Sequence, residues 1–272
     1  MPHDGKPRGP AALAALEGGR GADGLRCGIL ADLPGSPGEV LDSPAPVVAP
    51  DEAEALARRL FGLAATAHPL ASERDANFRL DAADGRRFVL KLANPAEDPA
   101  VTDFQTGALL RVAREDPALP VPRVVPALDG RPQVPLALSD GRGSVLRLLT
   151  WVEGEAVARV GLSPGLRRDL GRLRARLGAA LAGYDHPAAS HDLQWDVRNA
   201  ARLRPMLPAV ADDALRDRLG AELDRFEAVV LPRLPGLRHQ VVHNDLNHHN
   251  VVADPADPDR VAGIIDFGDM VR

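Results

Sequence analysis

The chain has 272 residues, of which 45% are hydrophobic and 26% are charged, as is ordinary for a folded globular protein. Its net charge of −5 provides no basic excess to neutralise nucleic-acid phosphates, and no apolar run approaches the roughly 20 residues that span a bilayer. Cys27 is the single cysteine, which excludes an internal disulfide framework. Since the N-terminus also lacks a signal peptide, we expect a cytoplasmic protein that binds neither nucleic acid nor membrane.

The N-terminal segment is predicted to be a disordered tail. Residues 1–47 are rich in Gly, Pro, Ala and Asp and show no sustained hydrophobic period, so they offer little apolar surface to offset the entropy of ordering. Order is expected to begin with a helix for which Asp51 is the N-cap candidate, because Leu56, Leu60 and Leu63 follow at helical spacing.

A β-hairpin is predicted next. A polar turn at residues 72–77 precedes two short apolar runs, residues 78–80 and 87–92, which are joined through Asp84 and Gly85. An Asp-Gly pair between two such runs is typical of a tight hairpin turn.

A helix over residues 99–113 follows, and a Pro-rich stretch at residues 117–126 interrupts it. Two further strands are expected at residues 121–127 and 145–150. The apolar stripe of the predicted helix consists of Val101, Phe104, Ala108, Leu109 and Val112.

After residue 151 the pattern becomes mainly helical. Ser163 and Pro164 are typical of the cap and first turn of a helix, here one with a leucine stripe that ends at Gly183. Another helix is expected over residues 212–231. Short strands are expected at residues 240–242, 251–252 and 262–265.

This order of elements indicates an α+β fold with two lobes. A strand-rich N-lobe over residues 48–150 is followed by a mainly helical C-lobe over residues 151–272, with the connector near residues 149–154.

The stretch richest in chemistry holds His243, Asp245 and Asn250 in the order H-x-D-x-x-x-x-N between two apolar pairs. Asp266 follows sixteen positions after Asn250, in a D-F-G-D sequence. Phosphoryl transfer requires a carboxylate that orients the acceptor hydroxyl and takes its proton, and an amide oxygen and a second carboxylate that hold Mg²⁺ against the nucleotide phosphates. His243 is interpreted as a buried histidine that supports the loop.

A lysine upstream completes the pattern. Lys91 ends the apolar strand Phe88-Val89-Leu90, a position from which an amine reaches the α- and β-phosphates of a nucleotide. Neither H-x-D-x-x-x-x-N nor D-F-G is specific alone, but both in this order and at this spacing, after a strand lysine, are a specific combination.

With these motifs the chain resembles the aminoglycoside phosphotransferase and choline kinase superfamily, relatives of the protein kinases. Within it the resemblance is strongest to hydroxylysine kinases and to the kinase domains that some bacterial proteins fuse to a class III aminotransferase. The resemblance covers about residues 50–272 and implies a protein-kinase-like fold with an antiparallel-sheet N-lobe that binds nucleotide. The stretches that carry the finer match are residues 72–78, 89–95, 186–196 and 265–269.

The resemblance also assigns roles. It implies that Asp245 is the catalytic base, that Asn250 and Asp266 bind Mg²⁺, and that Lys91 clamps the phosphates of ATP or GTP. It implies a loop over the nucleotide that includes Ser72, Arg74 and Asn77, and a hinge at residues 148–152.

The sequence departs from the family pattern at two places. At the position where this family has a glutamate that pairs with Lys91, the helix has Gln105, with Asp103 nearby and Glu97 further off. We expect the amide of Gln105 to hydrogen-bond the ammonium without supplying charge. The sequence also ends three residues after Asp269, so the helices that build part of the acceptor site in this superfamily are expected to be absent. The C-lobe is therefore expected to be C-terminally truncated, and fused C-terminal domains or self-association are expected.

The leading hypothesis is a kinase that phosphorylates a hydroxyl of a small amine-bearing metabolite, such as a hydroxylated amino acid or an amino alcohol. One alternative is an aminoglycoside antibiotic phosphotransferase. Another is a non-catalytic nucleotide-binding module or a fragment of a fusion protein, which Gln105 and the early end favour and which the intact Asp245, Asn250 and Asp266 disfavour.

Overall fold

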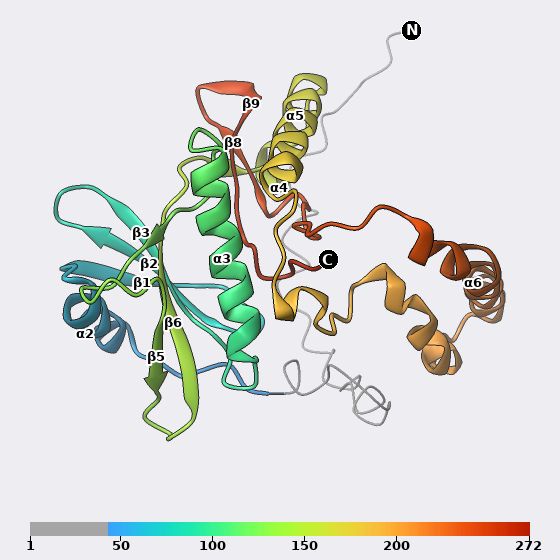
Figure 1. Cartoon of the computed structure of the whole chain (residues 1–272), viewed down its shortest axis with the longest axis horizontal. Helices are drawn as coiled ribbons and strands as arrows, with labels where there is room; N and C mark the ends of the chain where they lie inside the picture. The colour runs from blue at the N-terminus through green and yellow to red at the C-terminus, as the bar shows by residue number, and fades with distance from the viewer. Residues whose placement is uncertain (1–42) are drawn as a thin grey trace, which may run out of the picture. The chain divides into compact units, whose positions relative to one another are not determined.

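The computed structural model describes residues 43–272 (Figure 1). The tail predicted for residues 1–47 lies outside this part, apart from residues 43–47. The described residues contain a six-stranded sheet, a three-stranded sheet and the helices packed on them. Within this part of the chain no helix is both long enough and apolar enough to cross a membrane.

The larger sheet is antiparallel throughout and has the strand order β1-β2-β3-β6-β4, with β5 also paired to β6. The hairpin predicted around Asp84 and Gly85 is confirmed: it joins β2 to β3, and Gly85 adopts the positive φ of 83° that the turn needs. Strands β1 and β5 were not predicted. The strands are β1 (Ala65–Leu70), β2 (Ala76–Ala82), β3 (Arg87–Leu92), β4 (Val124–Val125), β5 (Val134–Ala137) and β6 (Gly143–Thr150).

Helix α2 (Pro50–Phe61) covers one face of this sheet, and its N-cap is Ala49 rather than Asp51, which corrects the sequence prediction. Pro50 occupies the first helical position, where no amide hydrogen is needed, so the helix begins two residues earlier than expected. The Asp51 carboxylate accepts a hydrogen bond from the Glu52 amide in the first turn.

The face of the sheet under α2 is apolar because alternate residues of β3 point into it. Phe88, Leu90 and Leu92 are buried there, as predicted from their spacing, together with Leu146 and Leu148 of β6. Val89 and Lys91 lie on the opposite face.

Helix α3 (Pro99–Glu115) has the Asp98 carboxylate as its N-cap. All five residues of the predicted apolar stripe are buried, so that prediction is confirmed. Four of them, Phe104, Ala108, Leu109 and Val112, belong to a second hydrophobic cluster that also contains Leu149 of β6 and residues of α5, such as Leu166 and Leu177.

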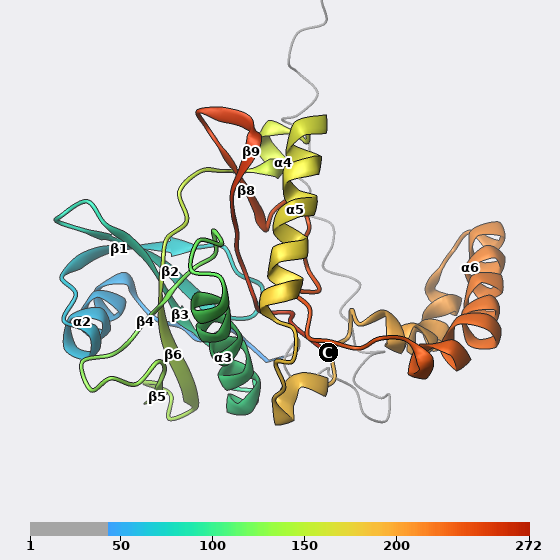
Figure 2. The same ribbon diagram turned by 45° about the horizontal axis from the view of Figure 1, so that its top comes forward.

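Helix α5 (Pro164–Ala180) starts as predicted, with the Ser163 hydroxyl accepting a hydrogen bond from the Leu166 amide. It ends before the predicted Gly183, which lies in the following turn with a φ of 70°. The α5 helix packs against the three-stranded sheet, whose order is β7-β8-β9 (Figure 2). The elements of this region are β7 (Glu155–Ala156), α4 (Val157–Val160), β8 (Val251–Asp254) and β9 (Asp257–Ile264).

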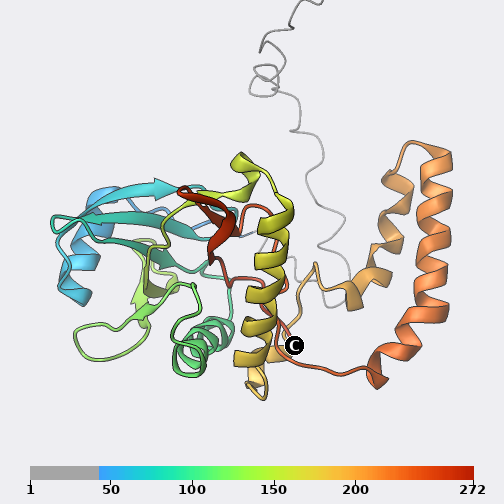
Figure 3. The ribbon, with the colours of Figure 1, turned by 90° about the horizontal axis from the view of Figure 1, so that it is seen from above.

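Between α5 and β8 the chain forms a run of helices. The helix predicted over residues 212–231 is present, with Asp212 as its N-cap, but its α-helical part stops at Arg225 and the chain continues as a π-helix and a 3-10 helix. Figures 2 and 3 show the later part of this run, from residue 197 to residue 236, beyond α5 on the side away from the larger sheet. Its elements are η1 (Pro187–Ser190), η2 (Val197–Ala209), α6 (Asp213–Arg225), η3 (Phe226–Val230) and η4 (Leu231–Gly236).

The strand expected at residues 240–242 is reduced to one bridge, between Val242 and Val271. The other two predicted strands are present as β8 and β9.

Gly154 sets the path between the two sheets. Its φ is 138°, and a Cβ placed there would overlap the carbonyl oxygen of Ala253 in β8. Only glycine therefore lets the segment after β6 approach the β8–β9 hairpin this closely.

We expect Gly154→Ala to lower the free energy of unfolding by about 2 kcal/mol or more, since both the backbone dihedral and the contact with Ala253 resist a side chain. Gly171→Ala is the matched control. Gly171 lies inside α5 with open space at its Cβ position, so its replacement should stabilise the chain by up to about 1 kcal/mol. Urea denaturation measures both values, and equal stability of Gly154→Ala and the wild type would contradict the account.

Candidate functional site

The β8–β9 hairpin brings the two ends of the motif region together. Val251 pairs with Ile264 at the open end of the hairpin, and the Ile265 amide donates to the carbonyl oxygen of Asn250 at 2.9 Å. The loop that carries Asp245 and Asn250 therefore ends beside Asp266. Of the two apolar pairs that flank the motif, Val251 and Val252 belong to β8 of this hairpin, whereas Val242 bridges Val271.

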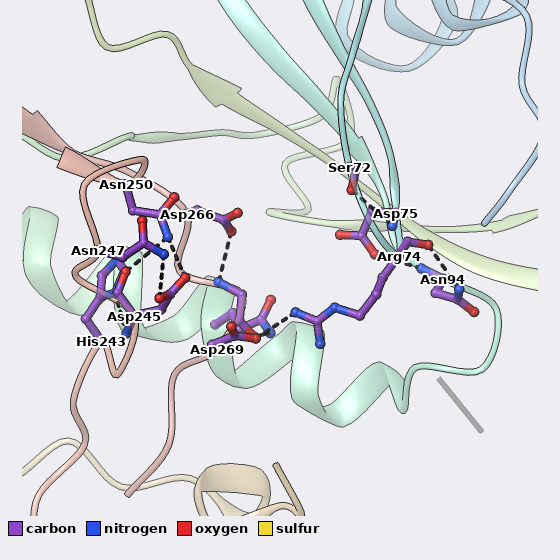
Figure 4. Close-up of polar contacts among 12 residues, drawn as sticks. Ser72, Arg74, Asp75, Asn94, His243, Asp245, Asn247, Asn250, Asp266 and Asp269 are labelled. Carbon is purple, nitrogen blue, oxygen red and sulfur yellow. Dashed lines mark hydrogen bonds and ion pairs between the residues drawn. The ribbon is translucent and has the colours of Figure 1, made fainter. Parts of the chain in front are cut away.

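The carboxylate of Asp245 is held from both sides (Figure 4). Its Oδ1 accepts a hydrogen bond from Asn247 Nδ2 at 2.8 Å, and its Oδ2 accepts one from Asn250 Nδ2 at 2.6 Å. The preceding residue, Asn244, has a φ of 66°, a left-handed conformation that turns the chain sharply before the aspartate. This arrangement fixes the carboxylate without neutralising it.

The buried His243 side chain supports the loop that carries Asp245, in agreement with its interpretation from the sequence. Its Nε2 donates to the carbonyl oxygen of Ile265 at 3.0 Å, and its Nδ1 accepts from the Asp245 amide at 3.3 Å. These two partners fix the neutral tautomer with the proton on Nε2. Burial lowers the pKa of His243, and the ring packs edge-on against Phe267 with centroids 4.7 Å apart.

Asp266 meets Lys91 between the two sheets. Lys91 Nζ lies 3.3 Å from Asp266 Oδ1 and 4.0 Å from Asp75 Oδ2. Asp266 has a φ of 59°, and its Oδ1 also accepts a hydrogen bond from the Gly268 amide at 3.2 Å. The positive charge of Lys91 lowers the pKa of Asp266 to about 2, against the opposing effect of burial.

The predicted nucleotide loop at residues 72–77 is tied to both sides of this site. Arg74 donates to Asp269 Oδ1 at 2.6 Å, so the structure pairs it with a carboxylate just beyond the D-F-G sequence. The Ser72 hydroxyl accepts a hydrogen bond from the Asp75 amide at 3.2 Å and closes the turn. Asn94, which is almost fully buried, donates to the carbonyl oxygen of Arg74 at 3.0 Å.

Gln105 and Asn77 do not make the contacts that were expected from the sequence. Gln105 Nε2 donates to the carbonyl oxygen of Gly268 at 2.8 Å, and the described residues contain no hydrogen bond between Gln105 and Lys91. The glutamine therefore anchors α3 to the D-F-G segment and does not hold the lysine. Asn77 lies in β2 directly opposite Lys91, and its side-chain oxygen is buried without a hydrogen-bond partner in the described part of the chain.

Sequence reasoning gave no role to Asp75, Asn94, Asp269 and Arg147. The structure places Asp75 and Arg147 beside Lys91, and it joins Asn94 and Asp269 to Arg74 of the neighbouring loop. Asp75, Asn94 and Asp269 lie in the stretches on which the resemblance to the kinase family rests, but they were given no contact of their own. Arg147 had a clear signal: it is the one charged residue in the otherwise apolar strand 145–150, directly opposite Lys91 in the register of β3 and β6.

The oxygen atoms left at the site suit a magnesium ion. Asn250 uses its Nδ2 on Asp245, and no donor in the described residues engages its Oδ1, while Asp266 uses only its Oδ1. One amide oxygen and one carboxylate are hard ligands, and Mg²⁺ usually takes one or two protein ligands with phosphates and water. Among the described residues no cluster of three or more His, Cys, Asp or Glu offers an alternative metal site.

This arrangement of sheet, helices and motif loop is the kinase-like fold. An amicoumacin kinase structure superposes with a TM-score of 0.56 at 17% identity, over 75% of this chain and 59% of that chain. A spectinomycin phosphotransferase structure gives 0.56 at 10% identity, over 83% of this chain and 71% of that one. The fold predicted from the sequence is thereby confirmed.

The sequence places the chain in a family. The model of the phosphotransferase enzyme family (APH) matches residues 66–272, and the chain belongs to that family. It is similar to the hydroxylysine kinase of Danio rerio, with 30% identity over 226 residues, or 78% of this chain and 63% of that protein. The hydroxylysine kinase of Mus musculus is 28% identical over 250 residues, or 83% of this chain and 65% of that protein. The chain thus matches just under two thirds of the length of these relatives.

We expect Lys91→Met to raise the pKa of Asp266 from about 2 toward its ordinary value, because the charge and the hydrogen bond of the ammonium that lower it are removed. A carboxylate with a depressed pKa adds stability above its ordinary pKa and loses it as the pH falls through about 2. The variant's loss of unfolding free energy should therefore be greatest near neutral pH and vanish toward pH 2.

Carboxyl ¹³C chemical shifts report the pKa of Asp266 directly. Arg86→Met is the control, because it removes an exposed ion pair with Asp84 at the hairpin turn and should leave Asp266 unchanged. A pKa for Asp266 that stays near 2 in Lys91→Met would show that the ammonium is not its cause.

Proposed function

We propose that this chain transfers the γ-phosphate of ATP or GTP, with Mg²⁺, to a hydroxyl of a small amine-bearing metabolite. The observation that carries the proposal is the convergence of Asp245, Asn250, Asp266 and Lys91 between the two sheets. A base, two oxygen ligands for a metal and a phosphate-binding amine are the parts that phosphoryl transfer needs.

Asp245 acts as the base in this proposal. Its carboxylate is held by Asn247 and Asn250, so it accepts the acceptor hydroxyl's proton while the oxygen forms its bond to the γ-phosphorus. The bond between the γ-phosphorus and the bridging oxygen breaks, and the nucleoside diphosphate leaves. Orientation contributes much of the rate, because the transfer is in line.

The remaining residues hold the donor. Lys91 exchanges its contact with Asp266 for the phosphate oxygens, while Asn250 Oδ1 and Asp266 would hold Mg²⁺. Mg²⁺ held there would neutralise charge on the phosphates. Arg74 and Asp269 keep the loop at residues 72–77 closed over this side of the site.

The acceptor class rests on the named relatives. Hydroxylysine, the substrate in the names of two relatives, bears amines as well as a hydroxyl. A solved structure described as an aminopropanol kinase superposes with a TM-score of 0.53 at 22% identity, over 79% of this chain and 68% of that chain. Both names describe a hydroxyl on a small molecule with an amine. A hydroxylated amino acid or an amino alcohol is therefore the proposed acceptor.

The test is nucleoside diphosphate release in the presence of Mg²⁺ with 5-hydroxylysine, with 1-amino-2-propanol and with a panel of aminoglycosides, using ATP and GTP in turn. The proposal expects release that depends on one of the small acceptors. Release only with aminoglycosides would favour the antibiotic alternative, and nucleotide binding without any acceptor-dependent release would favour a non-catalytic module.

Two substitutions separate the proposed roles. Asp245→Asn should lower kcat by about 100-fold or more and leave the Kd of the Mg·nucleotide complex within about twofold, because the base acts on the acceptor. Asp266→Ala should weaken Mg·nucleotide binding by about tenfold or more, since a carboxylate ligand is lost.

Steady-state kinetics and isothermal titration calorimetry measure the two effects. Asp254→Asn serves as the control, because Asp254 lies at the far end of the same hairpin. Equal nucleotide affinity in the wild type and Asp266→Ala would contradict the metal assignment.

A further inference from the structure

Arg147 is the most unusual charged residue in the described part of the chain. It lies in the middle of β6 and is only 5% exposed, and its side chain forms neither a hydrogen bond nor an ion pair with any described residue. Its Nε is buried without a partner. A guanidinium cannot discard its proton in a protein, and a buried charge without a partner is costly, so its presence points to an anion that completes the site.

The register of the sheet shows where that anion would lie. Asn77 of β2 is directly opposite Lys91 of β3, and Lys91 is directly opposite Arg147 of β6. Residues paired across antiparallel strands point to the same face with Cβ atoms about 5 Å apart. The three polar side chains therefore form one row across the sheet, on the face that Asp266 meets, and two of them carry a buried atom without a partner.

Among the described residues of this region, Arg147 is the cation whose side chain forms no ion pair. Arg74 is paired with Asp269, and Lys91 is paired with Asp266 and Asp75. The carboxylates of Asp75, Asp266 and Glu97 act on Arg147 electrostatically, but none of them forms an ion pair with it.

We propose that Arg147 is a second phosphate-binding residue, which stands beside Lys91 and hydrogen-bonds the phosphate oxygens of the nucleotide. This inference rests on the proposed function, because it needs the nucleotide phosphates to enter the row of Asn77, Lys91 and Arg147. The planar guanidinium offers several fixed donors, which suit phosphate oxygens, whereas Lys91 contributes a point charge.

The test is the affinity of Arg147→Met for ATP, ADP and AMP, measured by calorimetry with Mg²⁺ present. Loss of a charge-assisted contact to the outer phosphates should weaken ATP and ADP by about tenfold or more and AMP by less than about twofold. A purely structural role would weaken all three nucleotides alike, and that result would overturn the proposal.

Ser144→Ala is the matched control on the same strand. Ser144 is buried on the opposite face of β6, and its hydroxyl donates to the carbonyl oxygen of Ala93 at 2.7 Å. Its replacement should lower the melting temperature without changing the order of nucleotide affinities. If Ser144→Ala reproduces the graded loss of Arg147→Met, the effect comes from strand damage and the proposal is wrong.

Two further variants keep the test decisive. Arg147→Lys retains the charge but loses the planar set of donors, so its affinity for ATP and ADP should fall by less than that of Arg147→Met. If Arg147→Met does not fold, unchanged nucleotide affinities in Arg147→Lys would overturn the proposal. Glu97→Gln distinguishes the other possible partner of Arg147. We expect Glu97→Gln to bind ATP as tightly as the wild type or more tightly. A loss of ATP affinity like that of Arg147→Met would instead show that the role of Arg147 is to pair with Glu97.

The wild-type measurement separates this inference from the proposed function. If the affinity rises from AMP to ATP by the same factor in the wild type and in Arg147→Met, the proposed function is retained. In that case Arg147 does not bind the phosphates. A wild type that binds none of the three nucleotides contradicts the proposed function and the inference with it.

Discussion

The contact of Lys91 with Asp266 is the interaction on which the candidate site depends, because it joins two separately built parts of the chain. Lys91 belongs to β3, in the sheet that packs on α2, and Asp266 follows β9, in the sheet that packs on α5. Each side chain is positioned by strand pairing within its own sheet. The ammonium and the carboxylate, 3.3 Å apart, bring a cation and a set of oxygen ligands to one place. That combination is what a metal–phosphate complex needs.

The positions of the site residues are set by backbone conformations that cost free energy. Asn244 and Asp266 are the only non-glycine residues of the described chain with positive φ, and each stands at or beside a proposed functional carboxylate. The His243 ring and the Ile265–Asn250 hydrogen bond hold these turns in place. The surrounding hydrophobic cluster, which contains Phe267, Val251 and Ile264, supports both. Local strain is thus balanced by packing to which motif residues such as Phe267 contribute together with the β8–β9 hairpin.

Much of this architecture could be predicted from the sequence, because its strongest patterns are local. The hairpin at Gly85, the stripe of α3 and the cap of α5 at Ser163 each follow from the spacing of a few residues. Other features depend on contacts distant in sequence. The pairing of Arg74 with Asp269, the contact of Gln105 with Gly268 and the isolation of Arg147 arise only when β3, β6, α3 and the D-F-G segment meet. The N-cap of α2 was misplaced because an aspartate is a strong capping residue, yet Pro50 starts the helix before it.

The central claim is that nucleotide phosphates and Mg²⁺ bind between the two sheets, at the meeting point of Lys91 and Asp266. A crystal structure of the chain with Mg²⁺ and a non-hydrolysable ATP analogue tests it most directly. The account predicts a metal ion bound by Asn250 Oδ1 and the Asp266 carboxylate, with Lys91 Nζ moved onto a phosphate oxygen and Asp245 facing the γ-phosphate. A nucleotide bound elsewhere, or a metal held by other residues while Lys91 stays on Asp266, would contradict it.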